Sequence, residues 1–225
     1  MNVDAALAPS AHGRSRSHVE QQFDDLEQQR DASNLGMWVF LTTETLFFGA
    51  LFFGYAVSRT AFPEAFAAAS RHTSIVLGTI NTAVLLTSSF TMALAVRFAN
   101  ARRRRMAAML LAVTAALGLA FAGIKLTEYG IEYREHLVPT LDFAFAPEAL
   151  KRGAELFFWL YFTSTGLHLA HLSIGIAIVV AFAAIAWRSR STDIEAKVEA
   201  VGLYWHFVDL VWIFLYPCLY LVART

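Results

Sequence analysis

Five ionisable side chains lie deep inside long apolar segments of the chain: Glu44, His168, His171, His206 and Asp209. A charged group at the centre of a lipid bilayer costs about 2.5–3.5 kcal/mol, so each residue needs a partner or a function. Counted from the ends of their segments, at 1.5 Å per helical residue, all five fall at a similar depth. We therefore expect a buried hydrogen-bonded network, in which Glu44 is either protonated or paired with a histidine.

The same residues admit two other kinds of chemistry. His168 and His171 are three residues apart on one helix face, so a facing His206 could complete a metal site or supply an axial ligand to haem. Glu44 and Asp209 could instead form a proton relay, although no continuous chain of polar residues reaches either surface. We favour the structural interpretation, because buried histidines are most often satisfied by a hydrogen-bonding neighbour.

A second polar group lies near the end of another apolar segment. Lys125, Glu128 and Glu132 are spaced at i, i+3 and i+7, so Lys125 and Glu128 can pair on one helix face. We expect this group to form a salt-bridge cluster at the membrane interface, where it could also contact a neighbouring subunit.

The segments that carry these residues are long enough to cross a membrane. A transmembrane helix needs about 20 mostly apolar residues. Five runs meet this requirement: 35–57, 75–98, 107–129, 156–187 and 201–222. We therefore predict an all-α, polytopic membrane bundle of five transmembrane helices, because each span in lipid must satisfy its own backbone hydrogen bonds. The bundle forms one domain over 35–225, preceded by a polar, partly disordered tail over 1–34. A soluble helical protein is the weaker alternative.

The composition supports a membrane protein and excludes several partners. Hydrophobic residues make up 57% of the 225 residues and charged residues only 16%, against about 25% charged residues in a typical soluble domain. The 18 basic and 18 acidic residues cancel, so no nucleic-acid partner is indicated. The single cysteine, Cys218, excludes an intrachain disulfide and a thiolate metal cage.

Basic and aromatic residues predict how the helices sit in the membrane. The connections on the side of the N-terminal tail, including the arginines at 102–105, carry most of the basic residues. This bias predicts a cytoplasmic N-terminus and a C-terminus outside. Aromatic belts are expected at the cytoplasmic side from Trp38, Trp187, Tyr204 and Trp205, and at the outer side from Tyr55, Tyr129, Tyr133, Trp159, Tyr161 and Tyr220. Pro217 is expected to kink the last helix.

Tyr204 to Trp212 read Tyr-Trp-His-Phe-Val-Asp-Leu-Val-Trp. This string resembles the YWHFVDxVW signature on the closing helix of subunit III of the haem-copper terminal oxidases. Other segments resemble that family in the same order along the chain: Phe40–Phe48 around Glu44, Asn81–Leu86, the pair Glu128-Tyr129, and Thr165–His171 with its G-x-H-x-x-H pattern. The resemblance covers about residues 34–222.

The resemblance implies a non-catalytic subunit III of a bacterial haem-copper respiratory oxidase, a complex of the inner membrane that reduces O2 to water. Such a subunit packs directly against catalytic subunit I, with subunit II in the same complex, and supports proton uptake. It binds phospholipid, but haem and copper belong to the partner subunits. By position, Glu44, His168, His171, His206 and Asp209 would be the family's buried polar residues.

Five spans place the chain among the shorter members of this family, since mitochondrial-type members have seven. Five-span members occur in bacterial cytochrome c oxidases, in bo-type quinol oxidases and as accessory subunits of nitric oxide reductases. We favour the cytochrome c oxidase type and keep the other two as alternatives. A di-haem membrane anchor and a proton-coupled transporter are further alternatives; the lack of an internal repeat argues against the transporter.

Overall fold

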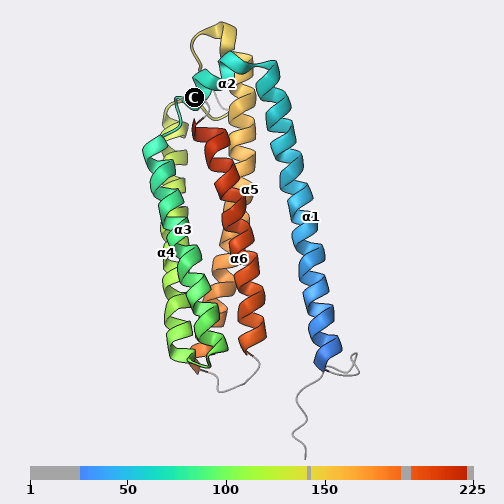
Figure 1. Ribbon diagram of the computed structural model, residues 1–225. Coiled ribbons are helices and arrows are strands. Elements are labelled where there is room, and N and C mark those ends of the chain that lie inside the picture. Colours follow the sequence, from blue (N-terminus) through green and yellow to red (C-terminus); the bar gives the residue numbers. More distant parts are fainter. Residues whose placement is uncertain (1–25, 141–142, 189–193, 222–225) are drawn as a thin grey trace, which may run out of the picture. The chain divides into compact units, whose positions relative to one another are not determined.

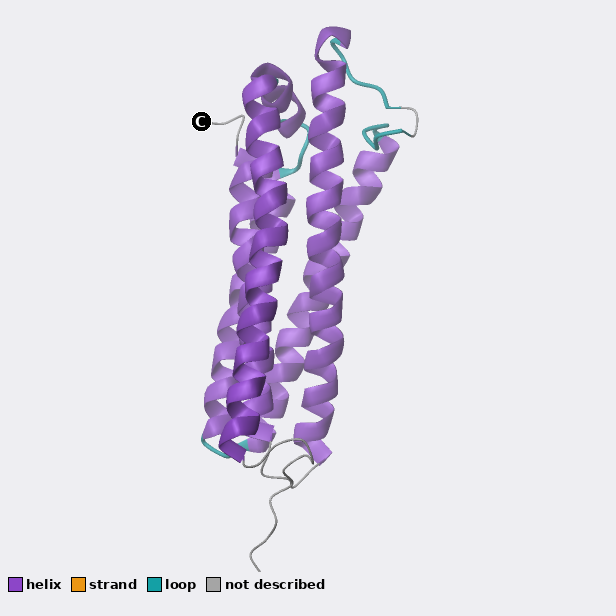
Figure 2. Ribbon diagram, turned by 90° about the vertical axis from the view of Figure 1, so that its right-hand side faces the viewer, coloured by secondary structure: helices purple, strands orange, loops and turns teal. Residues whose placement is uncertain are grey.

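A computed structural model describes residues 26–140, 143–188 and 194–221. Every regular element in these residues is helical, as Figure 2 shows, and five of the helices are long and apolar enough to cross a membrane. The predicted all-α membrane fold is therefore confirmed. The five long helices are α1 (Leu26–Ala61), α3 (Ile75–Asn100), α4 (Arg104–Arg134), α5 (Lys151–Arg188) and α6 (Ile194–Tyr216). Residues 1–25, which make up most of the predicted polar tail, lie outside the described residues.

The chain divides into two compact units, residues 1–40 and 41–225, and the packing reported below is that of the second unit. Helices α3 to α6 form a bundle in which α3 lies beside α4 and α6, and α5 also lies beside α4 and α6 (Figure 1). The part of α1 after residue 40 contacts α5 through His171 and α6 through Phe214. Each helix of the bundle therefore faces the core with only part of its circumference.

Most helices are longer than the apolar runs that predicted them. α5 has 38 residues, which gives a length of about 57 Å, well beyond a hydrocarbon core of about 30 Å. The extra turns hold charged residues such as Lys151 and Arg188, which ended the apolar run but do not end the helix. The helix must therefore tilt or extend beyond the lipid tails.

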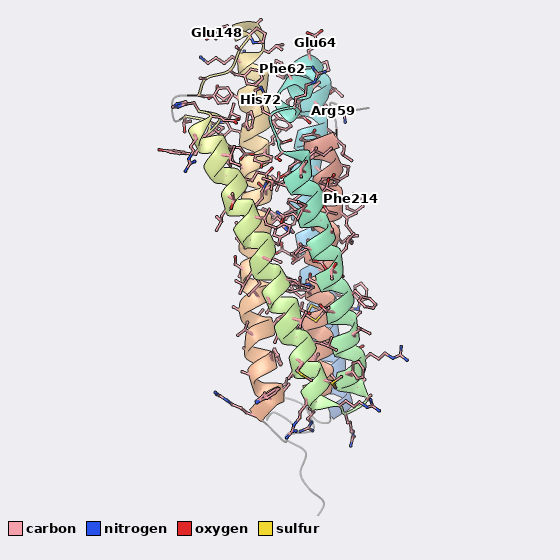
Figure 3. All side chains as sticks on the ribbon, turned by 90° about the vertical axis from the view of Figure 1, so that its left-hand side faces the viewer. Arg59, Phe62, Glu64, His72, Glu148 and Phe214 are labelled. Carbon is pink, nitrogen blue, oxygen red and sulfur yellow. The ribbon has the colours of Figure 1, made fainter. Side chains whose placement is uncertain are left out.

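Three short helical elements complete one end of the bundle: α2 (Pro63–Ser70), η1 (Glu148–Leu150) and η2 (Pro217–Leu221). Figure 3 labels Arg59, Phe62, Glu64, His72 and Glu148 at this end, which is called the α2 end below. Pro63 begins α2 at a position where its missing N–H costs nothing. The sequence analysis did not predict α2, because eight residues are too few for a spanning run.

Pro217 marks the change from α6 to η2. It has no backbone N–H, and its ring crowds the preceding turn, so the α-helical ladder cannot continue through it. The α-helix ends at Tyr216, and residues 217–221 continue as one wider π-helical turn. The predicted disturbance at Pro217 is thus a change of helix type, which turns Tyr220 into the core.

The outer surface of the second unit is apolar, as expected for helices that face lipid or other helices. Leu46 on α1 is 71% exposed and Phe90 on α3 is 63% exposed. Several aromatic residues predicted for the interfacial belts are instead inside the bundle. Those that are buried are Tyr55, Tyr161, Tyr204, Trp205 and Tyr220, whereas Tyr133, Trp159 and Trp187 are exposed. The belt prediction failed for the buried group because distance from a helix end says nothing about which face a ring occupies.

Candidate functional site

Glu44 on α1 and His171 on α5 form an ion pair near the surface of the bundle. His171 Nε2 lies 3.0 Å from Glu44 Oε2, and both side chains are 19% exposed. His171 Nδ1 donates to the carbonyl of Leu167, one turn earlier, across 2.9 Å. That bond places a proton on Nδ1, because a carbonyl oxygen can only accept, and leaves Nε2 facing the Glu44 carboxyl group. The contact between the two side chains therefore joins α1 to α5.

His168 lies only three residues before His171 but occupies a different environment. It is 1% exposed and lies between the rings of Phe121 and Trp212, with centroids 5.6 and 5.1 Å from its own. Neither of its ring nitrogens has a hydrogen-bond partner within the described residues. The imidazole therefore acts as an aromatic packing group at the centre of α4, α5 and α6.

The two polar residues on α6 make no shared contact with these histidines. His206 Nδ1 lies 2.7 Å from the hydroxyl of Ser89 on α3. Asp209 is 4% exposed and interacts with Ser89 as well, although neither of its carboxyl oxygens has a partner at ordinary hydrogen-bond distance among the described residues. Among the five residues predicted to share one buried network, the structure joins only Glu44 and His171 directly. Similar depth in the membrane did not predict contact between the side chains, because each side chain leaves its helix in a different direction.

The Tyr204–Trp212 segment, which carried the resemblance, ties α6 to the helices on either side. Each of its four polar rings bonds to another helix. Tyr204 Oη donates to the His171 carbonyl at 2.8 Å, and Trp205 Nε1 donates to Ser88 Oγ at 3.2 Å. His206 Nδ1 lies 2.7 Å from Ser89 Oγ, and Trp212 Nε1 donates to Thr82 Oγ1 at 3.0 Å. Three of these partners are on α3 and one is on α5. Interhelical hydrogen bonds of this kind hold transmembrane helices together where no hydrophobic force acts between them.

Lys125 forms the most densely bonded polar centre of the described chain. It is fully buried, and its ammonium nitrogen contacts three oxygens: Glu128 Oε2 at 2.9 Å, Tyr161 Oη at 2.6 Å and Tyr220 Oη at 2.7 Å. Tyr220 also donates to Glu128 Oε2 across 2.8 Å. The Tyr161 ring centroid lies 4.3 Å from the ammonium, so the ring face adds a cation–π contact.

The predicted pairing of Lys125 with Glu128 is present at 2.9 Å, but the group is buried inside the bundle and does not face a neighbouring subunit as expected. Lys125 is 0% exposed, and Glu128 and Glu132 are each 2% exposed, so none of the three can contact a neighbouring subunit. We refer to these three residues, with Tyr161 and Tyr220, as the lysine cage. The tyrosines were missed as site residues because they lie 36 and 95 positions from Lys125. Their only sequence signal was a polar ring within an otherwise apolar run.

The three histidines of the predicted network each have different neighbours in the described part of the chain. His171 is paired with Glu44, His206 is bonded to Ser89, and His168 is packed between two aromatic rings. No group of three or more histidine, cysteine or carboxylate side chains in the described part of the chain is arranged to hold a metal ion. The residues present thus do not fit the di-haem alternative, which needs histidines facing one another from opposed helices.

Comparison with known proteins identifies the family of this chain. The model of the family "Cytochrome c oxidase subunit III" matches residues 24–224. The chain is 28% identical over 210 residues to a "Probable quinol oxidase subunit 3" of Staphylococcus saprophyticus, covering 93% of this chain and 98% of that protein. Proteins with the same description from Staphylococcus epidermidis and Staphylococcus aureus are 28% and 26% identical, over the same shares of both chains. The chain therefore belongs to the cytochrome c oxidase subunit III family.

Proposed function

We propose that this chain is the subunit III of a bacterial haem-copper respiratory oxidase of the inner membrane, where it stabilises catalytic subunit I and supports proton uptake. The single observation that carries the proposal is the family match over residues 24–224. Haem, copper and O2 reduction to water belong to the partner subunits, and subunit II completes the complex. The chain itself contributes a helical scaffold that also binds membrane phospholipid.

The geometry supports a scaffold because the polar side chains are used to join helices. The rings of the Tyr204–Trp212 segment bond to α3 and α5, and the lysine cage joins α4, α5 and η2. The faces left outside are apolar, with Leu46 and Phe90 among the most exposed side chains. Apolar helix faces of this kind are suited to packing against the helices of another membrane subunit and against lipid.

The relatives favour quinol over cytochrome c as the electron donor of the complex. The similar proteins from three Staphylococcus species are each described as a probable quinol oxidase subunit 3. The chain covers 98% of the length of these relatives, so the likeness extends over the whole subunit. We therefore expect the purified complex to oxidise a quinol and to be inactive with reduced cytochrome c.

The experiment is to recover the complex from its own membranes in a mild detergent through a tag on this chain. We expect a large polytopic haem protein to co-purify and to consume O2 when a quinol is supplied. Consumption of nitric oxide in place of O2 would assign the chain to the nitric oxide reductase alternative. Recovery of a coloured chain without any partner would contradict the proposal and favour the haem anchor.

A deletion strain tests the stabilising role separately from membership in the complex. The oxidase isolated without this chain should begin with normal O2 consumption and lose activity faster during turnover than the complete enzyme. The matched control is the same strain carrying the wild-type gene on a plasmid, which should restore the lifetime. An unchanged lifetime in the deletion strain would contradict the stabilising role while leaving the family assignment intact.

A further inference from the structure

The lysine cage holds more carboxyl groups than its cation can balance. Lys125 is the only cation in contact with Glu128 and Glu132 among the described residues, and all three side chains are buried. The charged and titratable groups around Glu132, from each element packed against it, are Lys125, Glu128 and Tyr129 on α4, Tyr161 on α5, Tyr220 on η2, and the exposed Glu135 just after α4. One of the two buried carboxyl groups is therefore in excess.

The hydrogen-bond count shows which carboxyl group is in excess. An ammonium group has three N–H donors, and Lys125 directs one to Glu128, one to Tyr161 and one to Tyr220. Glu128 Oε2 also receives the hydroxyl proton of Tyr220, so Glu128 is the counter-ion of the cage. No donor of Lys125 remains for Glu132.

Glu132 is the carboxyl group of the cage that makes no close ion pair with Lys125. It is 2% exposed, and Tyr161 is the hydroxyl group that lies near enough to interact with it, although neither carboxyl oxygen has a partner at ordinary hydrogen-bond distance within the described residues. A carboxylate buried in this way loses its hydration and shares one cation with a second buried carboxylate, Glu128, which is a costly arrangement in a protein. A carboxylic acid at the same place carries no charge and leaves the cage neutral.

We propose that Glu132 is a proton-binding site: its side chain takes one proton from water at the α2 end and holds it as a buried carboxylic acid beside the Lys125–Glu128 pair. Binding forms one O–H bond on the carboxyl group and consumes no other reactant. All residues of the site come from this chain. The inference therefore goes beyond the proposed function and does not depend on which oxidase or electron donor the chain serves.

Infrared absorption of the complex, isolated through a tag on this chain and placed in lipid nanodiscs, tests the proposal. We expect the wild-type minus Glu132→Gln difference spectrum to show the carbonyl stretching band of one protonated carboxyl group, which moves to lower frequency in D2O. The control variant Glu64→Gln, at an exposed position on α2, should show no such band. A Glu132→Gln difference that contains only carboxylate bands would show that Glu132 is ionised and would overturn the proposal.

A second variant tests whether charge balance in the lysine cage is the reason that Glu132 holds a proton. In Glu128→Gln, Lys125 loses its counter-ion, and Glu132 becomes the only carboxylate able to balance it. We therefore expect the protonated-carboxyl band to disappear from Glu128→Gln although Glu132 is still present. Persistence of the band in this variant would overturn the charge-balance argument. Glu132→Gln tests the proposal even if Glu128→Gln does not assemble. If Glu132 is a neutral acid, Glu132→Gln replaces it with a neutral amide of the same shape and should assemble normally.

Discussion

Trp205 on α6 occupies the space that Gly118 leaves open on α4. A Cβ atom at position 118 would lie 2.9 Å from Cη2 of the Trp205 ring, closer than real side chains approach. Gly175 on α5 also lies close to the ring, because a Cβ atom there would lie 3.3 Å from Trp205 Cε3. The indole is fully buried between these two glycines and donates to Ser88 on α3. The Trp205 ring of α6 therefore limits how closely α4 and α5 can approach it, and its hydrogen bond joins α6 to α3.

We therefore expect Gly118→Val to destabilise the bundle by about 1–3 kcal/mol, the usual cost of overpacking a filled core. The measurement is the midpoint of thermal unfolding in detergent, followed by circular dichroism. Gly123→Val is the matched control, because it lies on the same helix with nothing within 4 Å of its added Cβ. Equal loss of stability in both variants would show that helix propensity, not contact with Trp205, limits position 118.

Two lysine–glutamate pairs of i, i+3 spacing differ strongly in burial, and this difference predicts their importance for stability. Lys125–Glu128 is buried at 2.9 Å, whereas Lys151–Glu148 is 38% and 81% exposed at 3.2 Å. Lys125→Met leaves Glu128 buried without its counter-ion, and we expect a loss of about 3–5 kcal/mol. Lys151→Met should cost about 0–1 kcal/mol, because water and salt screen an exposed pair.

The double variant Lys125→Met/Glu128→Gln separates loss of the pair from loss of one partner. Removing both charges leaves no uncompensated ion, so the double variant should be more stable than Lys125→Met alone. Thermal unfolding of Lys125→Met, Glu128→Gln and the double variant under the same conditions measures the difference. A double variant less stable than Lys125→Met would mean that the cage depends on something other than charge balance.

Trp212 allows a test of the interhelical hydrogen bonds made by the Tyr204–Trp212 segment. Trp212→Phe keeps a large aromatic ring against Phe121 and His168 but removes the N–H that donates to Thr82. We expect a loss of about 0.5–1.5 kcal/mol for the missing bond, in addition to the smaller ring. Thr82→Val should add little on top of Trp212→Phe, since both remove the same bond. Trp187→Phe, at an exposed position, is the control.

Sequence reasoning predicted the membrane fold well because hydropathy and length reflect one strong constraint, the thickness of the bilayer. The same reasoning placed Tyr161, Trp205 and Tyr220 in interfacial belts, although all three are fully buried. Distance from a helix end determines depth, but only contacts with other helices determine whether a ring faces lipid or core. Those contacts join residues far apart in the chain, such as Lys125 and Tyr220, and no local pattern records them.

The polar residues show the same limit at the level of the site. Their depth could be counted along the helices, and on that basis Glu44 was expected to be protonated or paired with a histidine; the structure pairs it with His171. The direction in which each side chain leaves its helix could not be predicted in this way, because His168 and His171 are three residues apart and still face different neighbours. The burial of the Lys125 group was missed because its charges suggested a surface.

The Glu44–His171 pair is the remaining test of how α1 is held to α5. His171→Ala leaves the Glu44 carboxyl group partly buried without its partner, and we expect a loss of about 1–3 kcal/mol. Glu44→Gln should cost less, because the amide can still bond to the imidazole. In the cycle with Glu44→Ala, thermal unfolding should give a coupling free energy of about 0.5–3 kcal/mol. His168→Ala provides the contrast, since His168 bonds to no carboxylate and should show no coupling to Glu44. Coupling of Glu44 to His168 as strong as its coupling to His171 would indicate a shared network that the separate contacts do not show.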